Sequence, residues 1–226
     1  MSQTTDNEQA GDYNFKDDVK WYQSPFNCQF GRFTAFAFEF PDGREHLAMV
    51  KGSPDTADLP LVRVQSSCLT GTAFLAHLCD CRQQLHLAME RVATEDAGVI
   101  LYMDQEGRGH GLVEKLAQLK LINTGLDTLE AAVARGYGPD PRTYEQAAFV
   151  LDVLVGAGRP IRLLSNNPTK MGGLRANGVV IGEDVRLETE PTPTNFHYLR
   201  VKQEKMGHIL PSLRSPAGIQ EMANSV

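Results

Sequence analysis

The sequence lacks several features that would place it in a specialised class of protein. No apolar run approaches the roughly 18 residues of a membrane-spanning helix, so no membrane association is expected. The N-terminus, MSQTTDNEQAGDYNFKDD, has no apolar segment typical of a secretory signal, which favours a cytoplasmic location. Positive charge is not in excess: the formal net charge is −6, which argues against a long nucleic-acid groove. A local basic pocket for a phosphorylated small molecule is still compatible with this charge.

Cysteine is also scarce, with four in 226 residues. Three of them, Cys68, Cys79 and Cys81, lie within the stretch CLTGTAFLAHLCDC. In a reducing compartment, clustered cysteines are metal ligands or catalysts more often than disulfides. Because Cys79 and Cys81 are two positions apart, an extended chain would point both thiols to one side, and a loop can bring Cys68 back beside them.

Three thiolates predict a zinc site with an open fourth position, which is typical of a catalytic rather than a structural zinc. Zinc lowers the pKa of a water in that position from about 15.7 toward 7. The alternative is three reduced cysteines packed as small apolar side chains. The spacing C-x10-C-x-C alone leaves both interpretations open.

The middle of the chain alternates strand-like and helix-like segments. Alternating apolar residues on both sides of PDG predict a hairpin, and PLVRVQSS, GVILYM and RPIRLLS predict further strands. Apolar stripes and closing glycines predict helices at 82–98, 110–125, 127–136, 143–158 and 166–178. The expected fold class is α/β, a mixed sheet covered by helices. We expect a disordered polar tail over 1–25, one domain over 26–187, and a partly ordered C-terminal extension over 188–226.

Three further motifs carry groups that can hold phosphate. DQEGRGHG allows close backbone approach at its glycines, and Arg108 adds a bidentate fork. YGPDPRTYE places Asp140 two positions before Arg142, and LLSNNPTK places Ser165 and Lys170 at a strand end and a first helical turn. Taken singly, each motif is better explained as ordinary structure: a Gly-rich turn, a capping Asp, or an Asn-Pro helix start.

Together and in order, these motifs are far more specific. The series RV-x-S-x-C-LTG, C-D-C, QEGR-x-x-GL, D-x-R, NNP-x-K and HYL…K-x-EKMGH resembles the GTP cyclohydrolase II family over roughly residues 26–210. The resemblance implies that family's fold and a zinc-dependent hydrolase, commonly a homodimer, with magnesium on the triphosphate. Such an enzyme opens the imidazole ring of GTP, removes C8 as formate and releases pyrophosphate. Its product is the diamino-ribosylamino-pyrimidinone phosphate of riboflavin biosynthesis.

The resemblance also assigns roles to residues. The family's zinc ligands match Cys68, Cys79 and Cys81, where zinc-bound hydroxide would attack C8. Its proposed nucleophile toward the α-phosphate matches Arg142, and the partner acid/base matches Asp140. A guanidinium normally keeps its proton, so electrostatic stabilisation of phosphate is the milder interpretation of Arg142. The substrate-contacting positions match Arg63, Val64, Gln65, Ser66, Ser67, Gln84, Glu106, Gly107, Arg108, Thr128, Ser165 and Lys170.

The sequence departs from the family pattern at three places. Among the substrate contacts, RVQSSC replaces the usual RVHSEC. Leu119 stands where the family has a Tyr that is associated with carrying the formylated intermediate on to loss of formate. Leu119 also continues an apolar stripe with Leu112 and Leu116, which predicts an ordinary core position. QEGRGHGL carries GH where NI is usual, and His110 is either a replacement polar group or a solvated side chain.

Three hypotheses follow. The first is a GTP cyclohydrolase II that makes the riboflavin precursor. The second is a paralogue that stops at the formamidopyrimidine product or acts on another purine nucleotide, which Leu119, Gln65 and Ser67 favour. The third is a non-catalytic nucleotide-binding regulator with structural zinc, against which the retained Asp140 and Arg142 argue.

Overall fold

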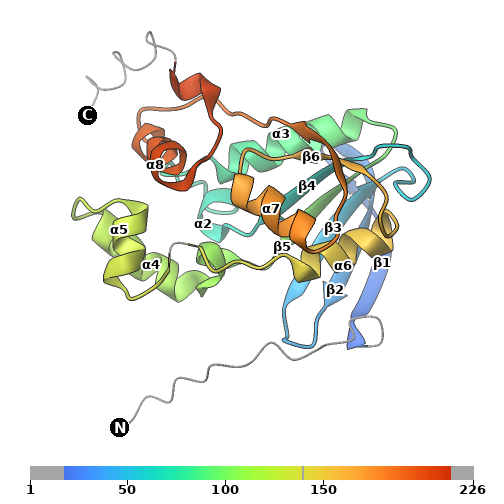
Figure 1. Cartoon of the computed structure of the whole chain (residues 1–226), viewed down its shortest axis with the longest axis horizontal. Coiled ribbons are helices and arrows are strands. Elements are labelled where there is room, and N and C mark those ends of the chain that lie inside the picture. The colour runs from blue at the N-terminus through green and yellow to red at the C-terminus, as the bar shows by residue number, and fades with distance from the viewer. Residues whose placement is uncertain (1–17, 139, 215–226) are drawn as a thin grey trace.

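A mixed β-sheet forms the centre of the molecule. The structure, a computed structural model, describes residues 18–138 and 140–214. Within these residues the sheet has seven strands in the order β1-β2-β3-β5-β4-β6-β7 (Figure 1). The strands are β1 (Lys20–Cys28), β2 (Gly31–Glu39), β3 (Glu45–Lys51), β4 (Leu61–Ser66), β5 (Gly98–Met103), β6 (Ile161–Leu164) and β7 (Ile181–Val185).

The antiparallel half of the sheet contains the predicted hairpin. β2 and β3 pair antiparallel, with Glu39 opposite Glu45 on either side of the PDG turn. β1 adds a further antiparallel strand that begins at Lys20, earlier than the start at residue 26 that the pattern suggested. Nearly all residues of β1 are exposed, so this edge strand has no buried face to give a clear alternation. The rest of the expected tail, residues 1–17, lies outside the described residues.

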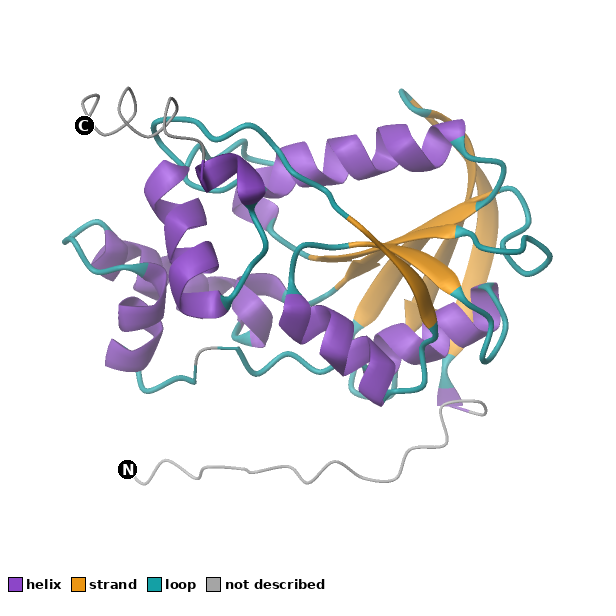
Figure 2. Ribbon diagram, turned by 45° about the horizontal axis from the view of Figure 1, so that its top comes forward, coloured by secondary structure: helices purple, strands orange, loops and turns teal. Residues whose placement is uncertain are grey.

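The parallel half of the sheet is covered by helices on both faces (Figure 2). β4 runs parallel to β5 and β6, and β6 runs parallel to β7. On one face, α3 (Cys81–Thr94) packs Ala88 and Val92 against strand residues. On the other, α6 (Glu145–Leu154) and α7 (Pro168–Ala176) share a second core with β4 and β5. The predicted fold class, a mixed sheet covered by helices, is therefore confirmed.

The remaining elements gather beyond the carboxyl ends of the parallel strands (Figure 2). They are α2 (Leu69–Thr72), η1 (Glu106–Gly109), α4 (Gly111–Ile122), α5 (Thr128–Ala134), α8 (Phe196–Met206) and η2 (Pro211–Arg214). Asp127 caps the start of helix α5: its carboxylate accepts hydrogen bonds from the backbone N–H groups of Leu129 and Glu130. Within the described residues, no helix is both long enough and apolar enough to cross a bilayer.

The exposure of helix α4 contradicts the prediction that its leucine stripe lies in the core. Leu112 is 36% exposed and Leu116 is 49% exposed. The helix projects beyond the sheet instead of lying on it, so its apolar side has no sheet to cover (Figure 1). The third leucine of the stripe, Leu119, is half-buried and contributes to a cavity.

Candidate active site

A cavity of about 240 Å³ opens at the carboxyl ends of β4, β5 and β6. In parallel sheets this edge collects the loops that follow the strands, and ligands bind there. Ser66 ends β4 and Ser67 follows it, Gln105 and Glu106 follow β5, and Ser165 follows β6. Helices α4, α5 and α8 supply the opposite side of the cavity. Residues that are distant in the sequence therefore meet at one place.

The three clustered cysteines converge in this cavity. Their Sγ atoms all lie within 4.8 Å of one another, and the Sγ atoms of Cys68 and Cys79 are 3.8 Å apart. None of them forms a disulfide. The expected extended geometry is wrong, because Asp80 has φ −97° and ψ 13° and Cys81 is the first residue of α3. The start of the helix, not a strand, turns the second and third thiols toward the first.

Gly71 in helix α2 keeps open the space next to the thiols. A Cβ atom at this position would lie 2.7 Å from Cys79 Sγ and 2.9 Å from Cys68 Sγ. Contacts this short would force a thiol to move, so the close approach of the α2 backbone to the cluster requires glycine. Three thiols around a small space suit a thiophilic ion such as Zn²⁺, and the residues present fit a three-thiolate site.

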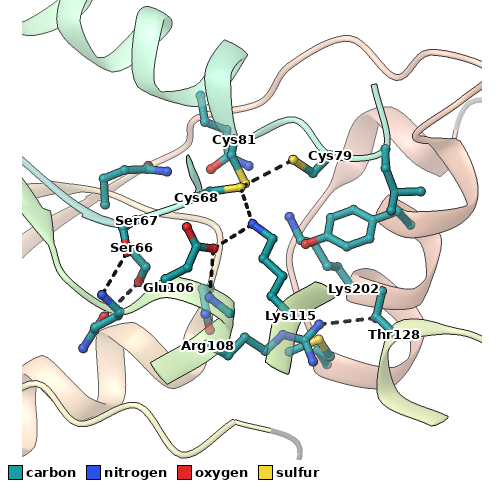
Figure 3. Close-up of a pocket in the computed structure, with 18 of the residues that line it drawn as sticks. Ser66, Ser67, Cys68, Cys79, Cys81, Glu106, Arg108, Lys115, Thr128 and Lys202 are labelled. Carbon is teal, nitrogen blue, oxygen red and sulfur yellow. Dashed lines mark hydrogen bonds and ion pairs between the residues drawn. The ribbon is translucent and has the colours of Figure 1, made fainter. Parts of the chain in front are cut away.

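Lys115 of helix α4 lies beside the cysteine cluster, and sequence reasoning did not identify it. Its Nζ is 3.1 Å from Cys68 Sγ and 2.7 Å from Glu106 Oε1 (Figure 3). Hydrogen bonds from Cys79, Cys81 and Lys115 lower the pKa of Cys68 despite burial. The Cys68 sulfur and burial raise the pKa of Cys79. The ammonium group of Lys115 therefore favours the thiolate form of Cys68, and a cation held by all three sulfurs would favour the thiolate form of each.

Asp140 and Arg142 form a bidentate ion pair at the cavity edge. Arg142 Nε lies 2.7 Å from Asp140 Oδ1, and Arg142 Nη2 lies 2.5 Å from Asp140 Oδ2. Arg142 Nη1 also donates to Ser66 Oγ at 3.1 Å. Burial opposes both charges, but the pair outweighs it: the pKa of Arg142 is raised and that of Asp140 is lowered. The guanidinium therefore stays charged and points along the end of β4.

Arg63 is buried beneath the cavity and tied to protein groups. Its Nε and Nη2 donate to Gln65 Oε1 at 2.9 and 2.6 Å. Its Nη1 donates to the Leu164 carbonyl at 2.9 Å, and Nη2 also donates to Gln84 Oε1 at 2.6 Å. Burial lowers the pKa of Arg63 to about 10, which keeps it charged at neutral pH. Gln65, which replaces the family's usual His, thus serves as an acceptor that fixes this guanidinium.

The turn after β5 positions Glu106 and Arg108. Gly107 and Arg108 both have left-handed backbone conformations, with φ of 58° and 62°. For Arg108 this conformation is strained, and strain of this kind collects at functional sites. Glu106 Oε2 accepts from the Leu69 N–H at 2.5 Å, and Arg108 Nη2 lies 3.3 Å from Thr128 Oγ1. The turn thereby links β5 to α2 on one side and to α5 on the other.

The loop after β6 positions Ser165, and the first turn of α7 positions Lys170; both residues are buried. Ser165 Oγ accepts from the Asn167 N–H at 3.2 Å, and Asn167 caps helix α7. Lys170 Nζ donates to the Val64 carbonyl. Burial, with Arg63 and Arg142 nearby, lowers the pKa of Lys170 well below its usual value. An anion in the cavity would favour the charged form of Lys170.

Most of the predicted site residues meet in this one cavity. All of the seventeen predicted positions except two line it or its cysteine corner: the Val64 side chain packs in the core, and Asp140 lies behind Arg142. His110 does not line it, because its ring packs on Tyr137 with centroids 4.3 Å apart. Sequence reasoning missed several lining residues: Gln105, Lys115, Gln118, Asn166, Asn167, Tyr198, Lys202 and His208. The HYL…K-x-EKMGH motif was the available signal for the last three.

One family model and several curated proteins match this chain in sequence. A model of the family described as GTP cyclohydrolase II matches residues 20–186. The riboflavin biosynthesis protein RibBA of Parabacteroides distasonis is 42% identical over 187 residues, covering 82% of this chain and 46% of the relative. RibBA of Bacillus velezensis is 45% identical over 183 residues, covering 80% and 46%. The chain thus spans less than half the length of these curated relatives.

A solved structure was also found. It is that of RibBX, a two-domain 3,4-dihydroxy-2-butanone 4-phosphate synthase from A. baumannii, with a TM-score of 0.40 and 18% sequence identity. The alignment covers 74% of this chain and 41% of that one.

Proposed function

This chain belongs to the GTP cyclohydrolase II family, and from that premise we propose that it hydrolyses GTP in a zinc-dependent reaction of that type. The proposed reaction opens the imidazole ring, releases formate and pyrophosphate, and leaves a diamino-ribosylamino-pyrimidinone phosphate. The relatives named above are riboflavin biosynthesis proteins, which supports the same pathway for this product. The observation that carries the proposal is the meeting of the three cysteines with Arg142 in one cavity.

Zinc would be held by Cys68, Cys79 and Cys81. The support is the convergence of the three Sγ atoms within 4.8 Å and the space that Gly71 keeps free. When bound with three protein ligands, zinc supplies a Lewis acid and lowers the pKa of a water in its open position. Lys115 would balance part of the thiolate charge through Cys68, since its Nζ lies 3.1 Å from that sulfur.

The charge of the cavity supports a triphosphate substrate. The lining has six basic side chains and one carboxylate, that of Glu106, although the chain as a whole has a net charge of −6. The basic residues are Arg63, Arg108, Lys115, Arg142, Lys170 and Lys202. Such a lining attracts a polyanion into an otherwise acidic protein. Magnesium would travel with the triphosphate, as expected from the family.

Arg142 would stabilise the phosphate at which pyrophosphate leaves. The Asp140 pair raises the pKa of Arg142, so loss of its proton to make a nucleophile is unfavourable. A fixed, charged guanidinium aimed along the β4 end can instead stabilise negative charge that develops on phosphate oxygens. Asp140 would orient that guanidinium through its two hydrogen bonds.

The base would lie against an apolar part of the cavity. Leu78, Leu119, Ile122 and Met206 line it, so guanine can be covered by side chains that do not compete for its polar groups. Leu119 offers no hydroxyl to the ring-opened product. The leucine at position 119 therefore favours a second candidate function. In it, the protein is a paralogue whose product keeps the formyl group or whose substrate is another purine nucleotide.

The deciding experiment follows three products in one reaction. The purified zinc-loaded protein is incubated with GTP and magnesium, and formate, pyrophosphate and nucleotide mass are recorded together. Equal formate and pyrophosphate with the diamino-pyrimidinone mass would support the main proposal. Pyrophosphate with a formylated product would support the paralogue. The matched control is Cys79→Ser, which removes one proposed ligand.

Two further results would redirect the assignment. Unchanged GTP would oppose both enzymatic proposals for this substrate, and other purine nucleotides would be tried next. GTP binding without conversion of any nucleotide would support the non-catalytic regulator.

The homodimer, the cytoplasmic location, and the division into residues 26–187 and a C-terminal extension are proposed with the family assignment. Sedimentation of the purified chain tests the homodimer directly.

A further inference from the structure

The C-terminal helix α8 forms one side of the cavity. Tyr198, Lys202 and Met206 all line it, and their spacing of four places them on one face of the helix. In Figure 3, Lys202 lies next to Cys79, on the side of the site opposite Ser66 and Ser67. Sequence reasoning placed this segment in an extension outside the main domain, yet it faces the proposed reaction centre.

Helix α8 is anchored at several points. Lys202 Nζ lies 3.1 Å from Asp80 Oδ1, and the two side chains are only 13% and 2% exposed. Asp80 stands between two of the clustered cysteines, so this ion pair joins the helix to the cysteine loop. Lys205 pairs with Asp127 at the start of α5, and the Ile209 N–H donates to the Asn166 carbonyl at 3.0 Å. The face of α8 that points into the cavity is therefore held in place.

The hydroxyl of Tyr198 is the polar group on this face of α8 that is left available for a ligand. Among the residues that the structure describes, none forms a hydrogen bond with it, and the half-buried Tyr198 lines the cavity, where a bound ligand can accept from the hydroxyl. The charged groups that act on it are Lys202, Cys81, Arg108 and Cys79, which surround the cavity. Burial raises the pKa of Tyr198, so the hydroxyl keeps its proton at neutral pH.

The ring of Tyr198 already has a separate structural role. Lys202 Nζ lies 4.4 Å from the ring centroid, a cation–π contact that packs the two side chains together. Because this contact uses the ring and not the oxygen, ring and hydroxyl can be tested apart. Removing the oxygen alone leaves the packing and the Lys202–Asp80 ion pair intact.

We infer that the Tyr198 hydroxyl donates a hydrogen bond to the part of the purine base that reacts beside the cysteines. Tyr198 is then a further catalytic residue, on a segment far in sequence from Asp140 and Arg142. The inference rests on the proposed function, because it takes a guanine nucleotide as the ligand. No bond to Tyr198 forms or breaks, and the hydroxyl keeps its proton throughout.

The test compares Tyr198→Phe with Tyr22→Phe. Tyr22 lies on β1 and is 81% exposed, so its variant controls for loss of a tyrosine hydroxyl in general. For Tyr198→Phe we expect the rate of ring opening to fall about 10²-fold, as when one aligned donor is removed from an active site. The Kd for GTP should rise about two- to tenfold, the effect of losing one net hydrogen bond. Zinc content and the far-UV circular dichroism spectrum should match those of the wild type.

Two results would overturn the inference. One is a Tyr198→Phe protein with wild-type rate and wild-type Kd. The other is loss of zinc or of folded structure in that variant, which would make the hydroxyl a structural group. A wild-type protein that binds GTP without converting it would refute the proposed function instead. In that case the Kd comparison decides the inference alone: a two- to tenfold rise supports it, and an unchanged Kd refutes it.

Discussion

The cavity has two walls that are built in different ways. The strand-end wall comes from β4, β5, β6 and the residues that follow them, and it includes Arg63, Gln65, Ser66, Gln105, Ser165 and Lys170. The helical wall comes from α4, α5 and α8, and it includes Lys115, Leu119, Thr128, Tyr198 and Lys202. Polar groups of the strand-end wall bind one another, as Arg63 does with Gln65. The lysines of the helical wall are paired as well, Lys115 with Glu106 and Lys202 with Asp80. This wall differs in presenting an apolar side chain, Leu119, and the Tyr198 hydroxyl, which has no hydrogen-bond partner among the described residues.

This difference suggests that the strand-end wall stabilises the fold and that the helical wall acts on the substrate. A strand-end wall whose hydrogen bonds are internal is preorganised and supports the stability of the fold. The helical wall lies outside the sheet and presents Leu119 and the Tyr198 hydroxyl to the base. Substitutions in the first wall should therefore reduce stability, whereas substitutions in the second should change the course of the reaction. The cysteine cluster lies between the two walls and should affect both metal binding and turnover.

The largest effect is expected where the walls meet. Cys79→Ser replaces a thiolate ligand by a hydroxyl that binds zinc poorly, so zinc content should fall below one per chain and GTP conversion should fall below detection. Metal analysis and pyrophosphate release measure these outcomes. The control is Cys28→Ser, which changes the fourth cysteine, located on β1 away from the cluster. Full zinc content with normal turnover in Cys79→Ser would contradict the assignment of the cluster.

Within the strand-end wall, Arg63→Met should cost the most stability. It leaves Gln65, Gln84 and the Leu164 carbonyl without their donor in a buried place. We expect a loss of about 1–3 kcal/mol in the free energy of unfolding, measured by urea denaturation. Arg32→Met on β2, where the side chain is exposed, should change stability by less than about 0.5 kcal/mol. Equal effects of the two variants would contradict a stabilising role for the Arg63 hydrogen bonds.

The Asp140–Arg142 pair predicts a pH-dependent contribution to stability. The folded pKa of Asp140 is lowered from 3.8, so its stabilising charge is fully present at neutral pH and is lost as the pH falls through the lowered value. Asp140→Asn should thus be less stable than the wild type at pH 7. The gap should close as the pH falls below 3.8, and urea denaturation across this range checks it. A gap that widens in acid would contradict the ion pair.

In the helical wall, Leu119→Tyr should change the products more than the fold. The added hydroxyl faces the cavity and can hydrogen-bond the ring-opened base, so the ratio of formate to pyrophosphate should rise if the wild-type product keeps its formyl group. Mass spectrometry of the nucleotide gives the ratio directly. Leu116→Tyr, on the exposed side of the same helix, is the control and should leave the ratio unchanged.

The smallest effect should come from the outer side of helix α4. Leu116→Ala removes a side chain that is 49% exposed, and we expect a loss of stability within about 0.5 kcal/mol. Leu154→Ala, in the core helix α6 where the side chain is 7% exposed, should cost about 2–5 kcal/mol. A large loss in Leu116→Ala would mean that another surface covers α4 in solution.

Local patterns predicted much of the fold. The PDG turn predicted the hairpin of β2 and β3, and the segment 127–136 predicted helix α5. Hydrophobic patterns gave wrong predictions where an element's apolar face is not the face that is buried, or where no face is buried. β1 is an edge strand with little buried surface, and the leucines of α4 form a helical stripe that no sheet covers. Hydrophobic periodicity reports that a face is apolar, but not what lies against it.

The sequence by itself determined the groups whose relation is local. Asp140 and Arg142 are two residues apart, and the short C-D-C segment holds Cys79 and Cys81 together. Only the tertiary structure decided that Lys115 lies beside Cys68 and that Tyr198 faces the same cavity. The reason is physical: spacing restricts neighbours in the chain through backbone geometry, whereas contacts between α2, α4 and α8 depend on how every helix packs at the end of the sheet.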